Sequence, residues 1–145
     1  MVSFCRIDER SIRVREPIAR PDFVVVGDPT LLHQVAVFEG LSDDGYVLIN
    51  SGREPDELGL GDLVAGLPDG HVVTVPASEL AREHLGRPLP NAALLGGFAG
   101  LCDEVGLESV RQAIHERFPG PIGEGNAGAA GAAFAYVERE AAAHA

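Results

Sequence analysis

The sequence predicts an α/β domain with a mostly parallel sheet and a helical C-terminal third. Three short apolar runs, at residues 23–26, 46–49 and 72–75, have the composition of buried strands. Helix-starting or turn-forming residues come after each run, and alternation of strands with helices is typical of a parallel sheet. From Pro88 onward the large apolar residues recur at helical spacing instead.

The N-terminal part predicts two short strands and then a buried one. Residues 2–7 and 11–14 fit a hairpin with its turn at residues 8–10, and Pro17 and Pro21 interrupt the segment after it. Residues 23–26 form a continuous apolar run, which is typical of a strand buried on both faces. Asp28 is expected to cap the next helix, with Pro29 as its first residue. Helical spacing of apolar residues then continues to Phe38.

The middle of the chain repeats this pattern. Residues 46–49 predict a second strand that ends before Asn50, and residues 54–61 predict a loop or a short turn of helix. Residues 72–75 predict the third strand. Ser78 is the expected N-cap of a helix over residues 79–85.

The C-terminal third predicts helices. Residues 91–105 place their large apolar side chains on one stripe, beside Gly96, Gly97 and Gly100. Glycines cost about 1 kcal/mol each inside a helix, so three so close together indicate that another backbone or a ligand approaches here. A second helix is expected to point Val110, Ala113, Ile114 and Phe118 inward and to end at residues 119–121. The rest, to residue 145, predicts an Ala-rich helix or a partly frayed tail.

Composition excludes several functions. The net charge is −11, and all eleven basic residues are Arg. A chain without Lys has neither a Schiff-base lysine nor a P-loop lysine, and an acidic chain is a poor binder of nucleic acid. No apolar run has membrane-spanning length and the start does not resemble a signal peptide, so we expect a cytoplasmic protein with no membrane contact.

Metal, cluster and catalytic patterns are weak. The two cysteines, Cys5 and Cys102, lie far apart, whereas a four-thiolate iron–sulfur cluster needs four. The five histidines show no metal-binding spacing. Residues 123–128 match G-x-G-x-x-G, but they come after a Pro-Gly-Pro turn and not a strand, which argues against a dinucleotide site. We therefore predict no catalytic residue and no metal ligand in this chain.

Polar residues stand directly after each predicted strand. Asp28 and Thr30, Asn50 and Ser51, and Ser78 should share the carboxyl edge of the sheet, where ligands bind in open α/β folds. One interpretation is a rim that faces a cofactor, CoA or an adjacent subunit. The other is helix capping and turn formation, which favours the same residue types. Asn91 and Gly96, in the glycine-rich helix, complete the candidate set: Asp28, Thr30, Asn50, Ser51, Asn91 and Gly96.

An ordered set of segments resembles the gamma subunit of pyruvate and other 2-oxoacid:ferredoxin oxidoreductases. The resemblance covers nearly the whole chain, through residues 6–13, 21–26, 28–32, 39–41, 45–50, 90–96, 105–110 and 135–136. It implies a three-layer α/β gamma-type domain over residues 1–145. It also implies CoA-dependent oxidative decarboxylation of a 2-oxoacid, with pyruvate as the first candidate, to acyl-CoA, CO2 and reduced ferredoxin.

The resemblance further implies a division of labour. Alpha, beta and delta subunits would be the partners, ferredoxin the electron acceptor, and the complex would use thiamine diphosphate, Mg²⁺, [4Fe–4S] clusters and CoA. This chain alone would bind none of them and would act through assembly.

The sequence departs from the family pattern at three places. The family's glycine-rich N-terminal segment is absent, so we expect a shortened chain; Ala92 replaces a frequent Thr, and Pro76 replaces a frequent acid. The alternative is a non-catalytic, truncated α/β module that binds a partner or an anion.

Overall fold

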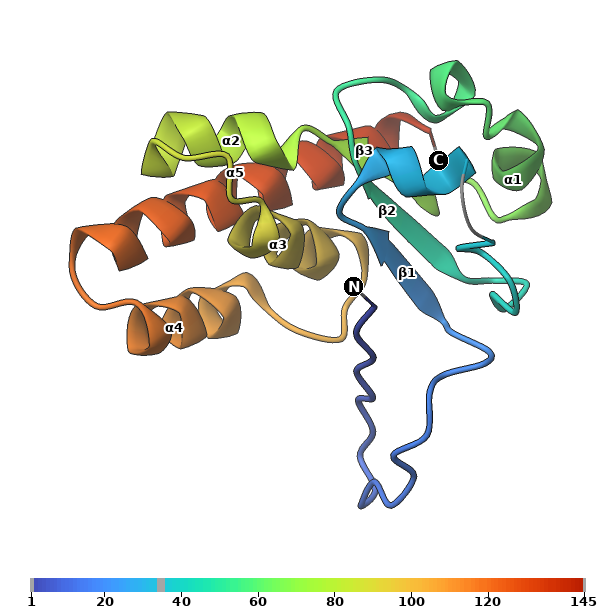
Figure 1. The fold of residues 1–145 in the computed structure, drawn as a ribbon, viewed down its shortest axis with the longest axis horizontal. Helices are drawn as coiled ribbons and strands as arrows, with labels where there is room; N and C mark the ends of the chain where they lie inside the picture. Colours follow the sequence, from blue (N-terminus) through green and yellow to red (C-terminus); the bar gives the residue numbers. More distant parts are fainter. Residues whose placement is uncertain (1, 34–35, 145) are drawn as a thin grey trace.

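A three-stranded parallel sheet forms the centre of the molecule (Figure 1). The computed structural model describes residues 2–33 and 36–144. The strands are β1 (Phe23–Val26), β2 (Tyr46–Asn50) and β3 (Val72–Val75), in the order β1-β2-β3. Both strand pairs are parallel. Val47 of β2 lies opposite Val24 of β1 on one side and Val72 of β3 on the other. The three strands predicted for the parallel sheet, and their direction, are confirmed.

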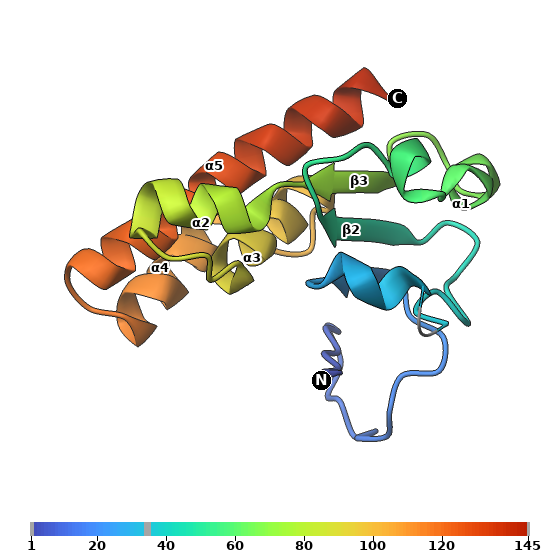
Figure 2. The same ribbon diagram turned by 45° about the horizontal axis from the view of Figure 1, so that its top comes forward.

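Helices connect the strands and complete the chain. Short 3-10 helices η1 (Pro29–His33) and η2 (Pro55–Leu58) and helix α1 (Gly61–Gly66) belong to the strand connections. Helices α2 (Ala77–Leu85), α3 (Asn91–Leu101), α4 (Leu107–Arg117) and α5 (Pro121–Ala143) come after β3. Figure 2 shows these four helices gathered at one side of the sheet, away from α1. Among the described residues no helix has the length and apolar character that crossing a membrane requires.

Alternate side chains of the strands make two cores, which produces three layers. On one face Leu48, Val73 and Val75 pack with side chains of α3 and α5. On the other face Val47 and Ile49 pack with apolar residues of η1, η2, α1 and the loops beside them. The three-layer α/β architecture with a helical C-terminal third is therefore confirmed.

Strand β1 is more exposed than the sequence predicted. Residues 23–26 were expected to be buried on both faces, but Val26 alone among them is buried, and Val25 is 44% exposed. The cause is position, because β1 lies at the edge of the sheet and β2 shields it from one side only.

The N-terminal hairpin prediction was wrong as secondary structure. Residues 2–7 and 11–14 run side by side without strand pairing. The Arg6 guanidinium joins the two limbs, because Nη1 donates to the carbonyl oxygens of Glu16 at 2.8 Å and Val14 at 3.5 Å. A side chain thus takes the place of the backbone ladder.

Several helix boundaries also differ from expectation. The helix after Asp28 is one short 3-10 segment, residues 34–35 lie outside the described residues, and turns come next. Helix α2 begins at Ala77, so Ser78 lies inside its first turn and is not the cap. Helix α3 ends at Leu101 and not at residue 105, and α1 was not predicted. Val110 and Ile114 of α4 are buried as expected, but Ala113 in the helix and Phe118 directly after it are exposed.

The candidate site at the carboxyl edge of the sheet

Asn50 ties together three elements at the carboxyl edge. It is the last residue of β2 and is only 9% exposed. Its Nδ2 donates to the Gly27 carbonyl oxygen and to Ser78 Oγ, both at 3.0 Å, and its Oδ1 accepts the Ser78 backbone N–H at 3.3 Å. An amide side chain suits this place because it carries a donor and an acceptor together. Asn50 therefore holds the end of β1 and the start of α2 against β2.

Asp28 and Thr30 form a compact turn at the end of β1. Asp28 Oδ1 accepts the Thr30 backbone N–H at 3.0 Å and the Thr30 hydroxyl at 2.7 Å. These bonds stabilise the charged carboxylate, so the Thr30 hydroxyl and then the Thr30 amide lower the pKa of Asp28. The Asp28 side chain remains exposed.

Ser51 completes the edge. Its Oγ accepts the Arg53 backbone N–H at 3.0 Å, and its own N–H donates to the Val75 carbonyl oxygen at 3.0 Å. Asp28, Thr30, Asn50, Ser51 and Ser78 thus lie along one edge, as the sequence predicted. Local turns account for the hydrogen bonds of Asp28, Thr30 and the Ser51 hydroxyl. Those of Asn50 and Ser78 join separate elements of the fold.

Asn91 and Gly96 occupy different environments. Asn91 is the exposed first residue of α3, and among the described residues its side chain makes no hydrogen bond. One turn later, Leu94 Cδ1 lies 3.8 Å from where a Cβ on Gly27 would stand, so the start of α3 borders the edge. Gly96 is instead buried, and a Cβ there would overlap the Ala130 carbonyl of α5. The close backbone approach expected from the glycines is a contact between α3 and α5.

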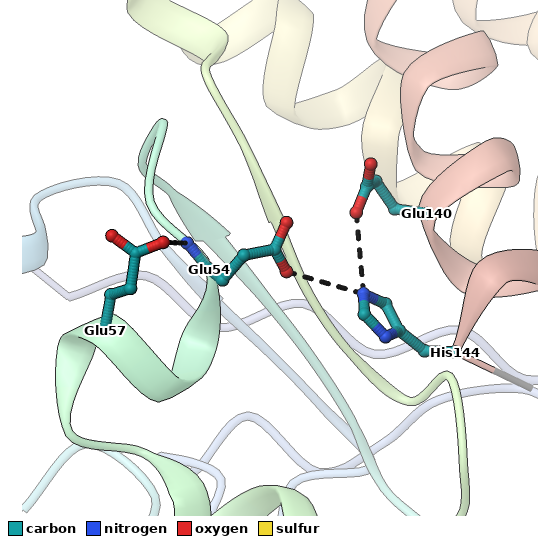
Figure 3. A network of polar contacts seen from close by, with 4 residues as sticks. All are labelled: Glu54, Glu57, Glu140 and His144. Carbon is teal, nitrogen blue, oxygen red and sulfur yellow. Dashed lines mark hydrogen bonds and ion pairs between the residues drawn. The ribbon is translucent and has the colours of Figure 1, made fainter.

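A second polar cluster escaped sequence reasoning. Figure 3 shows His144, near the C-terminus, between Glu54 and Glu140. His144 Nε2 lies 3.4 Å from Glu54 Oε2 and 3.6 Å from Glu140 Oε2. The four-residue spacing of Glu140 and His144 was a visible signal, but nothing in the sequence pointed to Glu54. Burial, and then the charges of Glu140 and Glu54, raise the pKa of Tyr136 beside this cluster.

The cluster is the one place in the described part of the chain where three metal-ligating side chains converge. Its donor atoms lie within 4.8 Å of one another, and the side chains of Glu54 and His144 are about half exposed. Exposed ion pairs of this kind hold segments together weakly. The arrangement therefore accounts for a contact between the end of α5 and the segment before η2.

The two cysteines lie in different surroundings. Cys5 is exposed, whereas Cys102 is partly buried at the end of α3, where its Sγ donates to the Phe98 carbonyl oxygen at 3.4 Å. Burial raises the pKa of the Cys102 thiol. Neither environment offers a second thiol.

The glycine motif of residues 123–128 has the wrong geometry for a dinucleotide site. These residues lie inside α5, so the G-x-G-x-x-G match lacks the strand–turn–helix arrangement that such a site needs. The Pro-Gly-Pro turn before these residues and their helical conformation both argue against a dinucleotide site.

Comparison with known proteins identifies the family. Residues 1–136 match the family described as pyruvate ferredoxin/flavodoxin oxidoreductase, and the chain belongs to this family. It is 42% identical over 139 residues to pyruvate synthase subunit PorC of Methanothermobacter thermautotrophicus, covering 96% of this chain and 72% of that protein. It is 43% identical over 134 residues to the pyruvate/ketoisovalerate oxidoreductases common subunit gamma of Thermococcus kodakarensis, covering 92% and 71%.

A solved structure has the same fold. Pyruvate oxidoreductase subunit PORC of Thermotoga maritima aligns with a TM-score of 0.69 at 28% identity. The alignment covers 81% of this chain and 64% of that one, so the chain spans less than two thirds of the solved subunit. The resemblance noted in the sequence is thereby confirmed at the level of family and fold.

Proposed function

We propose that this chain is the gamma subunit of a 2-oxoacid:ferredoxin oxidoreductase. The observation that carries the proposal is the identity of about two residues in five with gamma and PorC subunits over nearly the whole chain. The complex would convert a 2-oxoacid and CoA to acyl-CoA and CO2 and pass the electrons to ferredoxin. Pyruvate is the first substrate to test and ketoisovalerate the second, since both occur in the names of relatives.

The chain would act as a single domain that assembles with alpha, beta and delta subunits. Those subunits would hold thiamine diphosphate with Mg²⁺ and the [4Fe–4S] clusters. The cysteine content of this chain supports the assignment of the clusters to other subunits, because residues 1–145 contain two cysteines and a [4Fe–4S] cluster takes four thiolates. The residues of this chain therefore do not fit a cluster.

The carboxyl edge would face CoA or a neighbouring subunit. Asn50 is already occupied by its contacts with Gly27 and Ser78, so its task would be to hold the edge in shape. The groups that remain free to contact a partner are the exposed carboxylate of Asp28, the hydroxyl hydrogen of Ser51 and the amide of Asn91. Asn91 is the most informative residue to substitute in a test of this edge, because its exposed side chain can be changed without removing an internal contact.

Copurification tests the proposal. The tagged chain is expressed with its neighbouring genes, and the purified material is examined by intact mass spectrometry and by CoA-dependent viologen reduction with several 2-oxoacids. We expect larger subunits to copurify and to reduce viologen with pyruvate or ketoisovalerate. A lone, inactive chain would contradict the proposal and favour the non-catalytic module.

A matched pair of variants tests the edge. Asn91→Asp should lower the yield of complex or raise the CoA concentration needed for half-maximal rate, while Gln112→Ala, an exposed change on α4, should alter neither. Circular dichroism would check that both variants fold. Unchanged yield and rate in Asn91→Asp would remove this residue from the site.

A further inference from the structure

The cluster of Glu54, Glu140 and His144 brings together three side chains of metal-binding type (Figure 3). Each offers one donor atom, a carboxylate oxygen or the imidazole Nε2, and these atoms lie within 4.8 Å of one another. One imidazole nitrogen with two carboxylate oxygens is a donor set that Zn²⁺ and similar divalent transition metals accept. The cluster therefore has the chemistry of a metal site as well as that of an ion pair.

The spacing of the donor atoms fits a metal ion better than it fits hydrogen bonds. His144 Nε2 lies 3.4 Å from Glu54 Oε2 and 3.6 Å from Glu140 Oε2. Both distances exceed the range of about 2.7–3.2 Å for a good N–H···O hydrogen bond. A tetrahedral Zn²⁺ with bonds of about 2.0–2.2 Å to its ligands separates two donor atoms by about 3.3–3.6 Å. The observed contacts therefore have the length of the edges of a zinc coordination tetrahedron.

Two carboxylates face one imidazole in this cluster. Nε2 carries at most one proton, so it can donate to only one of the two carboxylates at a time. In the part of the chain that the structure describes, no arginine forms an ion pair with Glu54 or Glu140. One divalent ion between the three donor atoms would neutralise both carboxylates at once, in a chain whose net charge is −11.

Buried neighbours hold the three side chains in place, although the side chains themselves are partly exposed. Glu54 directly precedes Pro55, which is buried at the start of η2. Glu140 and His144 are four residues apart at the end of α5, a spacing that puts two side chains on the same face of a helix. Val137, one turn before Glu140, is fully buried and anchors this end of α5. Ligands that are positioned by packed elements bind a metal without large rearrangement.

We propose that Glu54, Glu140 and His144 bind one divalent transition-metal ion, with Zn²⁺ as the first ion to test. Three protein ligands leave the fourth tetrahedral position for water. The ion would join the end of α5 to the segment between β2 and η2, and so to the carboxyl edge of the sheet. The sequence predicted no metal ligand, because this site takes one histidine and two glutamates from separate segments instead of closely spaced histidines or cysteines.

Isothermal titration calorimetry of the metal-free full chain with zinc chloride tests the proposal. We expect one Zn²⁺ per chain. Glu54→Gln, Glu140→Gln and His144→Gln should each weaken binding at least about tenfold, since even the loss of a residue that only supports a metal ligand costs about 10–100-fold. Glu138→Gln, an exposed change on α5, and His115→Gln, an exposed change on α4, are the matched controls and should bind Zn²⁺ as wild type does.

Two further measurements locate the ion and show what it does. Co²⁺ in place of Zn²⁺ should give wild type the intense visible absorption of a four-coordinate ion, and His144→Gln should lose this absorption. Zn²⁺ should also raise the melting temperature of wild type, followed by circular dichroism, because a ligand that binds only the native state stabilises it. The melting temperature of His144→Gln should be the same with and without Zn²⁺.

A wild-type chain that binds no Zn²⁺ would overturn the proposal and leave the cluster as an ion pair. Equal affinity for Zn²⁺ in wild type and in the three glutamine variants would overturn it as well, because the ion would then lie elsewhere, for example at the exposed thiol of Cys5. A Co²⁺ absorption that His144→Gln leaves unchanged would count against the site in the same way.

Discussion

Gly96→Ala should destabilise the fold by separating α3 from α5. A Cβ at residue 96 would overlap the carbonyl group and the Cα of Ala130, and backbone atoms inside a helix cannot move aside alone. Overpacking typically costs about 1–3 kcal/mol, and a clash with backbone belongs at the upper end of that range. Alanine regains about 1 kcal/mol of helix propensity over glycine. The net loss should therefore be about 2 kcal/mol, which lowers the melting temperature by roughly 4–8 °C in a chain of this size.

Urea unfolding measured by circular dichroism reports this loss, and Gly131→Ala is its control. Gly131 lies in the interior of α5, but its Cβ would meet the end of the Arg111 side chain, 2.6 Å away, which can rotate aside. Gly131→Ala should be neutral or more stable than wild type. If Gly96→Ala unfolds at the same urea concentration as wild type and with an unchanged slope, the contact with the α5 backbone does not constrain residue 96.

Three further substitutions and one reactivity measurement test individual contacts. Asn50→Ala should lower the free energy of unfolding, measured with urea, by about 2 kcal/mol, since it leaves the Gly27 carbonyl and Ser78 without their partner. An unfolding midpoint equal to that of wild type would show that these hydrogen bonds do not stabilise the fold. Asp28→Asn should lower stability at pH 7, and the difference should vanish as pH falls through the lowered pKa of Asp28; a difference that persists at pH values well below that pKa would contradict this assignment. Cys102 should react with iodoacetamide more slowly in the native chain than in urea, since burial raises its pKa; equal rates would count against burial. His144→Gln should cost less than about 1 kcal/mol, because the side chains of His144 and Glu54 are about half exposed; a larger loss would show that the cluster is structurally important.

The strands could be predicted because local sequence and tertiary position agree there. Residues 46–49 and 72–75 lie in strands covered on both faces of the sheet, so their apolar composition alone was enough to predict these strands. Residues 23–26 have an equally apolar run but lie at an edge, and a sequence pattern does not say which strand takes the outside position. The parallel order came from the alternation of elements, whereas the exposure of Val25 depended on the completed sheet.

Residues 2–14 and the start of α2 show where local signals in the sequence mislead. Apolar and polar residues alternate in residues 11–14 and nearly so in residues 2–7, which favours strands, yet the Arg6 guanidinium and not a backbone ladder joins the two segments. Ser78 has the composition of an N-cap, but Asn50 binds both its hydroxyl and its amide from 28 residues away. Such long-range partners leave no periodic mark in the sequence.

The candidate site was predicted in its location but only partly in its chemistry. The carboxyl edge gathers Asp28, Asn50 and Ser51 because parallel strands end there together. What the sequence left open was which of these side chains remain free, and the hydrogen bonds of Asn50 decide this for the central residue. Gly96 was placed at the rim by its sequence neighbours, although α5 covers it.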